Sequence, residues 1–208
     1  MTIDLNFEKK LKDKHGYLYI AGLDEVGRGP LAGPVTVGAF VFYTDLTAEL
    51  KLLRDSKLLS EKQRKSLYEN FKQLKKEGKV DFATSSCFPS TIDKKQIHHA
   101  SVLAMRRAVK KLDKNPDFAI IDKFPYRGEV LRDVSYRGIR RADNLVPSVA
   151  AASIVAKVKR DRSMATYYHK KYPQYRFDLH KGYGTELHYK MLKKHGPSPI
   201  HRKSFRLS

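Results

Sequence analysis

The sequence predicts an α/β domain in which a mixed β-sheet is covered by helices. Short segments rich in apolar and β-branched residues alternate with longer segments of helical periodicity. A length of 208 residues suits one domain, and 41% hydrophobic residues exclude a disordered chain. The sequence shows no stretch near the ~20 apolar residues of a membrane helix and no secretory signal at its start.

Strands are expected where aromatic and β-branched residues end at turn-forming residues. In VTVGAFVF, Val35, Val37 and Val41 fall on one face, and Phe40 on the other. The preceding connection, rich in glycine and proline, must turn sharply. The expected strands are 17–24, 35–42, 80–87, 118–122 and 134–140.

Helices are expected between these strands. Ser60 followed by Gln63 forms a capping-box pattern, and the helix it opens ends at Gly78. Pro147 and Pro173 frame a long helix over 147–172. Two more helical segments are expected, at 94–112 and early in the tail 185–208, which then becomes irregular.

Charge and cysteine content restrict the class of protein. Lys and Arg number 42 and Asp and Glu 22, giving a net charge of +20. Such a surplus favours a nucleic-acid partner, with a lysine-rich surface of a heat-adapted protein as the alternative. The single cysteine, Cys87, excludes an internal disulfide and a cysteine-based zinc site. We expect Cys87 to be buried and the protein to work in a reducing cytoplasm.

Four acids are candidates for catalysis. Asp24 with Glu25 and, separately, Asp122 end predicted strands, and Asp143 precedes the long helix. Each alone could be an ordinary strand-end or helix-start acid. Together, carboxylates in a protein this basic would repel one another unless cations lie among them, and carboxylate oxygens suit Mg²⁺ or Mn²⁺. Two such ions could cleave a phosphodiester, which is the chemistry of a nuclease.

The histidines offer a weaker alternative. His98 and His99 are adjacent on a predicted helix and face different directions. No zinc-ligand spacing is present, so surface or phosphate-contacting histidines are expected instead. The others lie scattered in the C-terminal third, at His180, His188, His195 and His201.

The run DEVGRGPLAGPV at 24–35 resembles the N-terminal signature of type 2 ribonuclease H, the ribonuclease HII family. Further segments agree in order, namely DSKLLS at 55–60, AAASIVAK at 150–157, HKGYGT at 180–185 and HGPSPIHR at 195–202. The resemblance covers about residues 17–205. Lys123 and Ala142 stand where the family usually has glycine.

The resemblance implies a ribonuclease H-like fold, a five-stranded mixed sheet flanked by helices with a helical C-terminal extension. The implied domains are an N-terminal extension (1–16), a catalytic domain (17–172) and a C-terminal helical segment (173–208) that contributes to substrate binding. The implied activity is cleavage of the RNA strand of RNA–DNA hybrids and cleavage 5′ of single ribonucleotides in duplex DNA. It uses two ions of Mg²⁺ or Mn²⁺ and leaves 3′-hydroxyl and 5′-phosphate ends.

Site residues follow from the same resemblance. Asp24, Glu25, Asp122 and Asp143 match the family's metal-binding and catalytic acids. Gly27, Arg28 and Gly29 match the loop that reads the 2′-hydroxyl, and Tyr183 matches the tyrosine that stacks on the next deoxyribose. Lys57, Ser153 and Lys157 are expected to contact phosphates.

Two other functions remain open at this point. A basic nucleic-acid-binding protein would show salt-dependent binding without turnover, and a junction resolvase would ignore the 2′-hydroxyl. Type 3 ribonuclease H fits less well, because only about 16 residues precede the first predicted strand and Arg28 is kept. We expect a monomer; a replication-clamp partner cannot be recognised from the residues.

Overall fold

A five-stranded mixed sheet forms the centre of the protein. The computed structural model describes residues 3–4, 6–44, 53, 59–122 and 130–207. Strand β1 pairs antiparallel with β2 and parallel with β4, which confirms the predicted mixed sheet. Its order is β3-β2-β1-β4-β5, with bounds β1 (Ile20–Val26), β2 (Val35–Phe42), β3 (Val80–Cys87), β4 (Phe118–Asp122) and β5 (Ser135–Ile139).

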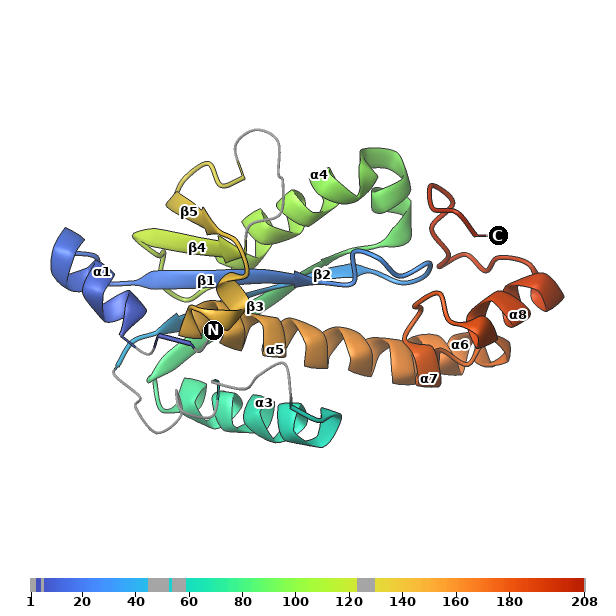
Figure 1. Cartoon of the computed structure of the whole chain (residues 1–208), viewed down its shortest axis with the longest axis horizontal. Coiled ribbons are helices and arrows are strands. Elements are labelled where there is room, and N and C mark those ends of the chain that lie inside the picture. Colours follow the sequence, from blue (N-terminus) through green and yellow to red (C-terminus); the bar gives the residue numbers. More distant parts are fainter. Residues whose placement is uncertain (1–2, 5, 45–52, 54–58, 123–129, 208) are drawn as a thin grey trace.

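Helices cover both faces of the sheet (Figure 1). Helix α4 (Pro89–Val109) packs on one face, where Met105 joins a core cluster with residues of β1 and β2. Helices α3 (Glu61–Lys76) and α5 (Pro147–Ser163) pack on the other, where Phe71 and Val155 share a cluster with Phe40. The two clusters enclose the sheet between apolar layers, as its strand patterns predict.

The predicted boundaries fail at β1 and α4. Strand β1 continues two residues beyond Asp24, to Val26. Helix α4 begins at Pro89 rather than at residue 94. Gln96 interrupts it with φ 64° and ψ 156°, a conformation that non-glycine residues rarely adopt. This break divides the helix, so the regular periodicity begins only after it.

Helix α1 (Phe7–His15) lies in a segment for which the sequence predicts no structure. It contains no fully buried residue, which explains its weak apolar pattern. Glu8 Oε1 accepts a hydrogen bond of 2.8 Å from the Ser148 N–H. Because Val146 provides no side-chain cap, Glu8 caps helix α5 from a distant part of the chain.

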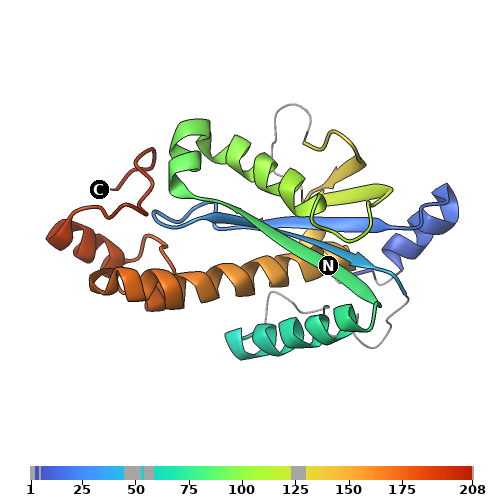
Figure 2. The same ribbon diagram turned by 180° about the vertical axis from the view of Figure 1, so that it is seen from behind.

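The C-terminal third is helical, as predicted. A π-helical turn, η2 (Met164–Tyr168), and α6 (His169–Lys171) continue α5, which confirms the predicted helical run. The following elements are gathered beyond the end of α5, near the β1–β2 loop (Figure 2). Leu31 of that loop shares a core cluster with Phe177 and Leu192. These elements are η3 (Pro173–Tyr175), α7 (Phe177–His180) and α8 (Glu186–His195).

Among the described helices, none combines the length and the apolar composition that a transmembrane segment requires. Cys87 is buried, as predicted, and burial raises the pKa of its thiol.

Candidate active site

Two neighbouring parallel strands carry Asp24 and Asp122. Leu23 of β1 lies opposite Ile121 of β4, so the two aspartates follow at the same level of the sheet. Asp143 lies in the short helix η1 (Ala142–Asn144), between β5 and α5. Strand alternation sends Asp24 toward α5 and Glu25 toward the α4 face. The structure therefore brings three acids to one face of the sheet and Glu25 to the other.

The Asp24 carboxyl group is the electrostatic centre of this arrangement. It is 7% exposed, and its pKa lies well above the usual value of an aspartate. Burial is the largest cause, followed by the negative charge of Glu25 and further contributions from Asp122 and Asp143. A hydrogen bond from Ser153 opposes the shift. Protein donors thus only partly offset the repulsion among the four acids.

A backbone donor holds Asp122. The Ala142 N–H donates a hydrogen bond of 2.9 Å to Asp122 Oδ1. Ala142 is fully buried, and the preceding Arg141 has a positive φ of 57°, which turns the chain at this point. The alanine at the position where glycine is usual therefore fits the local backbone. Lys123 lies outside the described residues.

The donor set suits a divalent cation, although the side chains do not yet surround one point. No three His, Cys, Asp or Glu side chains in the described part of the chain are placed to hold a single ion. Carboxylate oxygens are nevertheless the preferred ligands of Mg²⁺ and Mn²⁺, and a bound cation would relieve the repulsion that raises the Asp24 pKa.

The β1–β2 loop (residues 27–34) follows the acids directly. Gly27 has a φ of 91°, and a Cβ atom there would lie 2.1 Å from Arg160 Nε, so only glycine fits. Arg28 is half-buried, with its Nη1 3.3 Å from Ser101 Oγ and 3.6 Å from Glu25 Oε1. Gly29 is exposed. The loop thus offers accessible backbone beside the acids.

Tyr183 lies against the same loop. Tyr183 is 38% exposed. Arg160 and Lys157 each place a cationic group 5.4 Å from the centroid of its ring. Cations at this distance attract the ring face. The carbonyl oxygen of the preceding Gly182 accepts a hydrogen bond of 2.9 Å from the Leu31 N–H, which fastens this turn to the loop.

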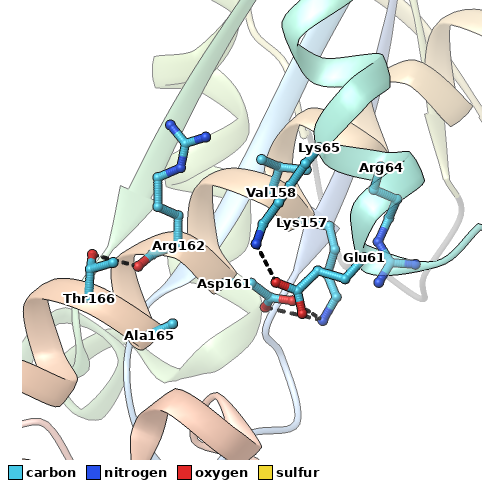
Figure 3. A pocket seen from close by; sticks show the side chains of 9 residues that line it. All are labelled: Glu61, Arg64, Lys65, Lys157, Val158, Asp161, Arg162, Ala165 and Thr166. Carbon is cyan, nitrogen blue, oxygen red and sulfur yellow. Dashed lines mark hydrogen bonds and ion pairs between the residues drawn. The ribbon is translucent and has the colours of Figure 1, made fainter.

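Helix α5 carries Ser153 and Lys157, two of the residues that are expected to contact phosphates. Ser153 hydrogen-bonds the Asp24 carboxyl group, and Lys157 Nζ forms an ion pair of 2.8 Å with Asp161. Lys157 also lines a cavity of about 330 Å³ between α3 and α5, together with Arg64 and other basic side chains (Figure 3). Lys57 lies outside the described residues.

The prediction of surface or phosphate-contacting histidines is wrong for three of them. His180, His188 and His201 are buried in the C-terminal segment. His188 Nδ1 lies 2.9 Å from the Tyr183 carbonyl oxygen, and the Nε2 atoms of His188 and His201 are 2.9 Å apart. Burial lowers the pKa of both residues to about 4. Packing among aromatic rings, which no spacing rule reveals, holds them neutral.

Two buried arginines are functional candidates that the sequence patterns do not reveal. Arg160 and Arg202 are 1% and 0% exposed, and their guanidinium groups bond to carbonyl oxygens of the β1–β2 loop. A basic residue in a basic segment is normally assumed to lie at the surface. The one signal was the position of Arg202 at the end of HGPSPIHR, whereas Arg160 lies outside the quoted motifs.

The chain is similar to known proteins along nearly its whole length. The family model described as Ribonuclease HII matches residues 21–208. The Ribonuclease HII of Acholeplasma laidlawii is 46% identical over 206 residues, covering 99% of this chain and 96% of its own.

Two solved structures share the fold. The PCNA:RNase HII complex from Archaeoglobus fulgidus contains a chain with a TM-score of 0.76 and 24% identity, covering 92% of this chain and 96% of that one. Bst-RNase HIII in complex with Mn²⁺ gives a TM-score of 0.64 at 20% identity, covering 86% and 63%. On the family match and the close relative, the chain belongs to the ribonuclease HII family and is a type 2 ribonuclease H, a metal-dependent hydrolase that cleaves RNA paired with DNA.

Proposed function

We propose that this ribonuclease H also cuts 5′ of single ribonucleotides embedded in duplex DNA, by a two-metal-ion reaction that leaves 3′-hydroxyl and 5′-phosphate ends. The observation that carries the proposal is the Asp24 carboxyl group, which lies immediately before a glycine loop and whose pKa is raised by burial and, after that, by three other acids. A carboxylate cluster beside exposed backbone can combine phosphodiester cleavage with recognition of one sugar.

Asp24, Glu25, Asp122 and Asp143 would hold two ions of Mg²⁺ or Mn²⁺. When bound, these ions supply an activated water and stabilise the charge on the leaving oxygen. Ser153 orients the Asp24 carboxylate, and the Ala142 N–H orients that of Asp122. The Mn²⁺ complex of the related Bst-RNase HIII supports a divalent metal, and Mn²⁺ in particular.

Substrate recognition is assigned to the loop and to Tyr183. A 2′-hydroxyl is the only group that distinguishes one ribonucleotide from a deoxyribonucleotide in otherwise identical DNA. Gly27, Arg28 and Gly29 bring backbone groups close to that hydroxyl, because glycine leaves no side chain in the way. Tyr183 stacks on the following deoxyribose and disfavours a hydroxyl there.

Phosphate binding is assigned to Lys57, Ser153 and Lys157. Lys157 would exchange its ion pair with Asp161 for a substrate phosphate, within a surface of net positive charge.

The proposed domains are an N-terminal extension (1–16), a catalytic domain (17–172) and a C-terminal segment (173–208) that contributes Tyr183 to substrate binding.

We also propose that the protein acts as a cytoplasmic monomer with a replication clamp as partner. The A. fulgidus protein described in complex with PCNA supports the partner, and the single buried cysteine is compatible with a reducing compartment. Light scattering during gel filtration should give the mass of one chain. Addition of the clamp of the source organism should shift the elution, and an unchanged profile would contradict the partnership.

Cleavage of matched DNA duplexes tests the proposed reaction. The duplexes carry an end label and differ only in one central ribonucleotide, and each is incubated with Mg²⁺, Mn²⁺ or a chelator. We expect metal-dependent cleavage just 5′ of the ribonucleotide and no cleavage of the all-DNA duplex. Cleavage of both duplexes would leave the acids in place and refute recognition of the 2′-hydroxyl. A long RNA–DNA hybrid serves as the third substrate. Cleavage of this hybrid without cleavage at the single ribonucleotide would refute ribonucleotide excision.

A further inference from the structure

Residues 201–204, here called the tail segment, contact the β1–β2 loop directly and are linked to Tyr183 through His188. They lie near the C-terminal end of the chain, where HRKS follows Ile200. His201 forms an isolated β-bridge with Ala32 of the β1–β2 loop. The Arg202 N–H donates a hydrogen bond of 2.8 Å to the Leu31 carbonyl oxygen. The backbone of the tail segment therefore runs directly along the loop.

The Arg202 side chain holds the first residues of that loop. Its Nη2 donates to the Gly27 carbonyl oxygen at 2.5 Å, its Nη1 to that of Arg28 at 2.7 Å, and its Nε to that of Gly33 at 3.0 Å. A planar guanidinium group with donors on three nitrogens fixes the relative positions of three carbonyl groups. Lysine, with one nitrogen, could not reproduce this pattern.

Burial of this cation is costly, which indicates a specific role. Arg202 is 0% exposed, and burial with the nearby Arg160 lowers its pKa to about 9, so it remains charged at neutral pH. Arg160 approaches from α5, and its Nε donates to the Pro34 carbonyl oxygen at 2.9 Å. Two like charges are thus buried around one loop, and the loop's carbonyl oxygens stabilise both.

A chain of neutral histidines connects the tail segment to Tyr183. The Ser198 N–H donates to His201 Nδ1 at 2.8 Å, so the proton of His201 is on Nε2. That proton is donated to His188 Nε2 at 2.9 Å, and His188 Nδ1–H donates to the Tyr183 carbonyl oxygen at 2.9 Å. The direction of every bond in this chain is therefore determined.

The other end of the tail segment is tied to α4. Asp93 accepts hydrogen bonds from the Ser204 N–H at 2.9 Å and from the Lys203 N–H at 3.1 Å. Consecutive residues thus contact the glycine loop and α4 directly and the Tyr183 turn through His188. A short rigid segment with these contacts fixes the distance between the loop and Tyr183.

We propose that Arg202, with His201, is a positioning residue for specificity: it sets the spacing between the Gly27–Gly29 backbone and Tyr183 that allows one 2′-hydroxyl to be recognised. The inference rests on the proposed reading of the 2′-hydroxyl by these two elements. A displacement of about 1 Å at such a site can reduce activity about a hundredfold.

Arg202→Gln tests this role, with Arg206→Gln as the matched control. Arg206 is exposed in the same tail, so both variants lose one positive charge. Dissociation constants are measured in chelator by fluorescence anisotropy, for the ribonucleotide duplex and for the all-DNA duplex. We expect Arg202→Gln to reduce the preference for the ribonucleotide duplex about tenfold or more, Arg202→Lys to reduce it less, and Arg206→Gln to retain it.

A purely structural role would lower the fraction of active protein but leave the ratio of the two dissociation constants unchanged. That result in a folded Arg202 variant, judged by circular dichroism, would overturn the inference. If neither Arg202 variant folds, Asp93→Ala decides: it releases the surface end of the tail segment and should reduce the same ratio about threefold, whereas an unchanged ratio refutes the role. If the wild type shows no preference, the proposed reading of the 2′-hydroxyl fails instead.

Discussion

The acid cluster and the buried arginines are both groups of like charge, but they differ in how far hydrogen bonds within the fold stabilise those charges. Arg160 and Arg202 donate to carbonyl oxygens of the β1–β2 loop, so their charges are stabilised within the fold. Asp24 keeps a raised pKa although Ser153 and the Glu25 N–H both donate to it. The arginine pair is therefore stabilised by the fold itself, whereas the acid cluster keeps a repulsion that the proposed metal ions would relieve.

The largest effect is expected from Asp24→Asn, which removes one charge from the acid cluster. We predict a loss of hybrid cleavage of about 1,000-fold or more, because the metal site loses its buried ligand. The metal-free variant should unfold at an equal or higher temperature, since repulsion is relieved. Single-turnover rates, anisotropy binding and thermal melts check these points. Retained cleavage would remove Asp24 from the mechanism.

Tyr183→Ala comes next, because it removes stacking but leaves the acids intact. Cleavage at a single ribonucleotide should fall about tenfold to a hundredfold, because the deoxyribose loses the ring that positions it. Cleavage within a long hybrid should fall less. Tyr189→Ala is the matched control, since Tyr189 is exposed to a similar extent, 40% against 38%. Equal losses on both substrates would argue against a role at the junction.

Acid should weaken the C-terminal segment before it affects the sheet. The pKa values of His188 and His201 are lowered to about 4 in the folded state, against 6.5 ordinarily. The unfolded chain therefore binds more protons between these values, and stability present above pH 6.5 is lost as the pH falls toward 4. Each histidine contributes up to about 1.4 kcal/mol per pH unit.

Urea unfolding between pH 7 and pH 4.5 measures this slope. His201→Gln should flatten it, whereas His99→Gln, at an exposed position, should not. A slope that is the same in all three proteins would show that the buried histidines do not titrate as described.

The smallest effect is expected at Glu8, which caps α5 and is not among the site acids. Glu8→Ala should lower the free energy of unfolding by about 1 kcal/mol, because α5 loses its cap. Glu8→Gln keeps an acceptor and should cost less. Urea titrations measure both, and cleavage rates at saturating substrate should stay unchanged. Wild-type stability of Glu8→Ala would mean that water caps α5 equally well.

The elements predicted correctly are those with strong local patterns. Alternating apolar residues identified β2, the Ser60 capping box identified the start of α3, and two prolines framed the helical run of α5. Helix α1 was missed because none of its residues is fully buried. The break at Gln96 was missed because a glutamine gives no signal of a positive φ.

The site residues also divide into those that a local sequence pattern reveals and those that it does not. The acids could be proposed from sequence because strand ends are places where carboxylates gather, and the role of the Gly27–Gly29 loop because its run resembles the family signature. Arg202 and His201 could not, because their roles depend on burial against segments more than 100 residues away in the chain, as the Arg202–Gly27 bond shows. Local patterns carry no information about such contacts.

The most direct test of the contrast between the two clusters is a titration of the metal-free protein with Mn²⁺, followed by electron paramagnetic resonance. The account predicts that the wild type binds Mn²⁺, that Mg²⁺ displaces it, and that Asp24→Asn loses this binding. Equal binding of Mn²⁺ by the wild type and Asp24→Asn would contradict the assignment of the acid cluster as the metal site.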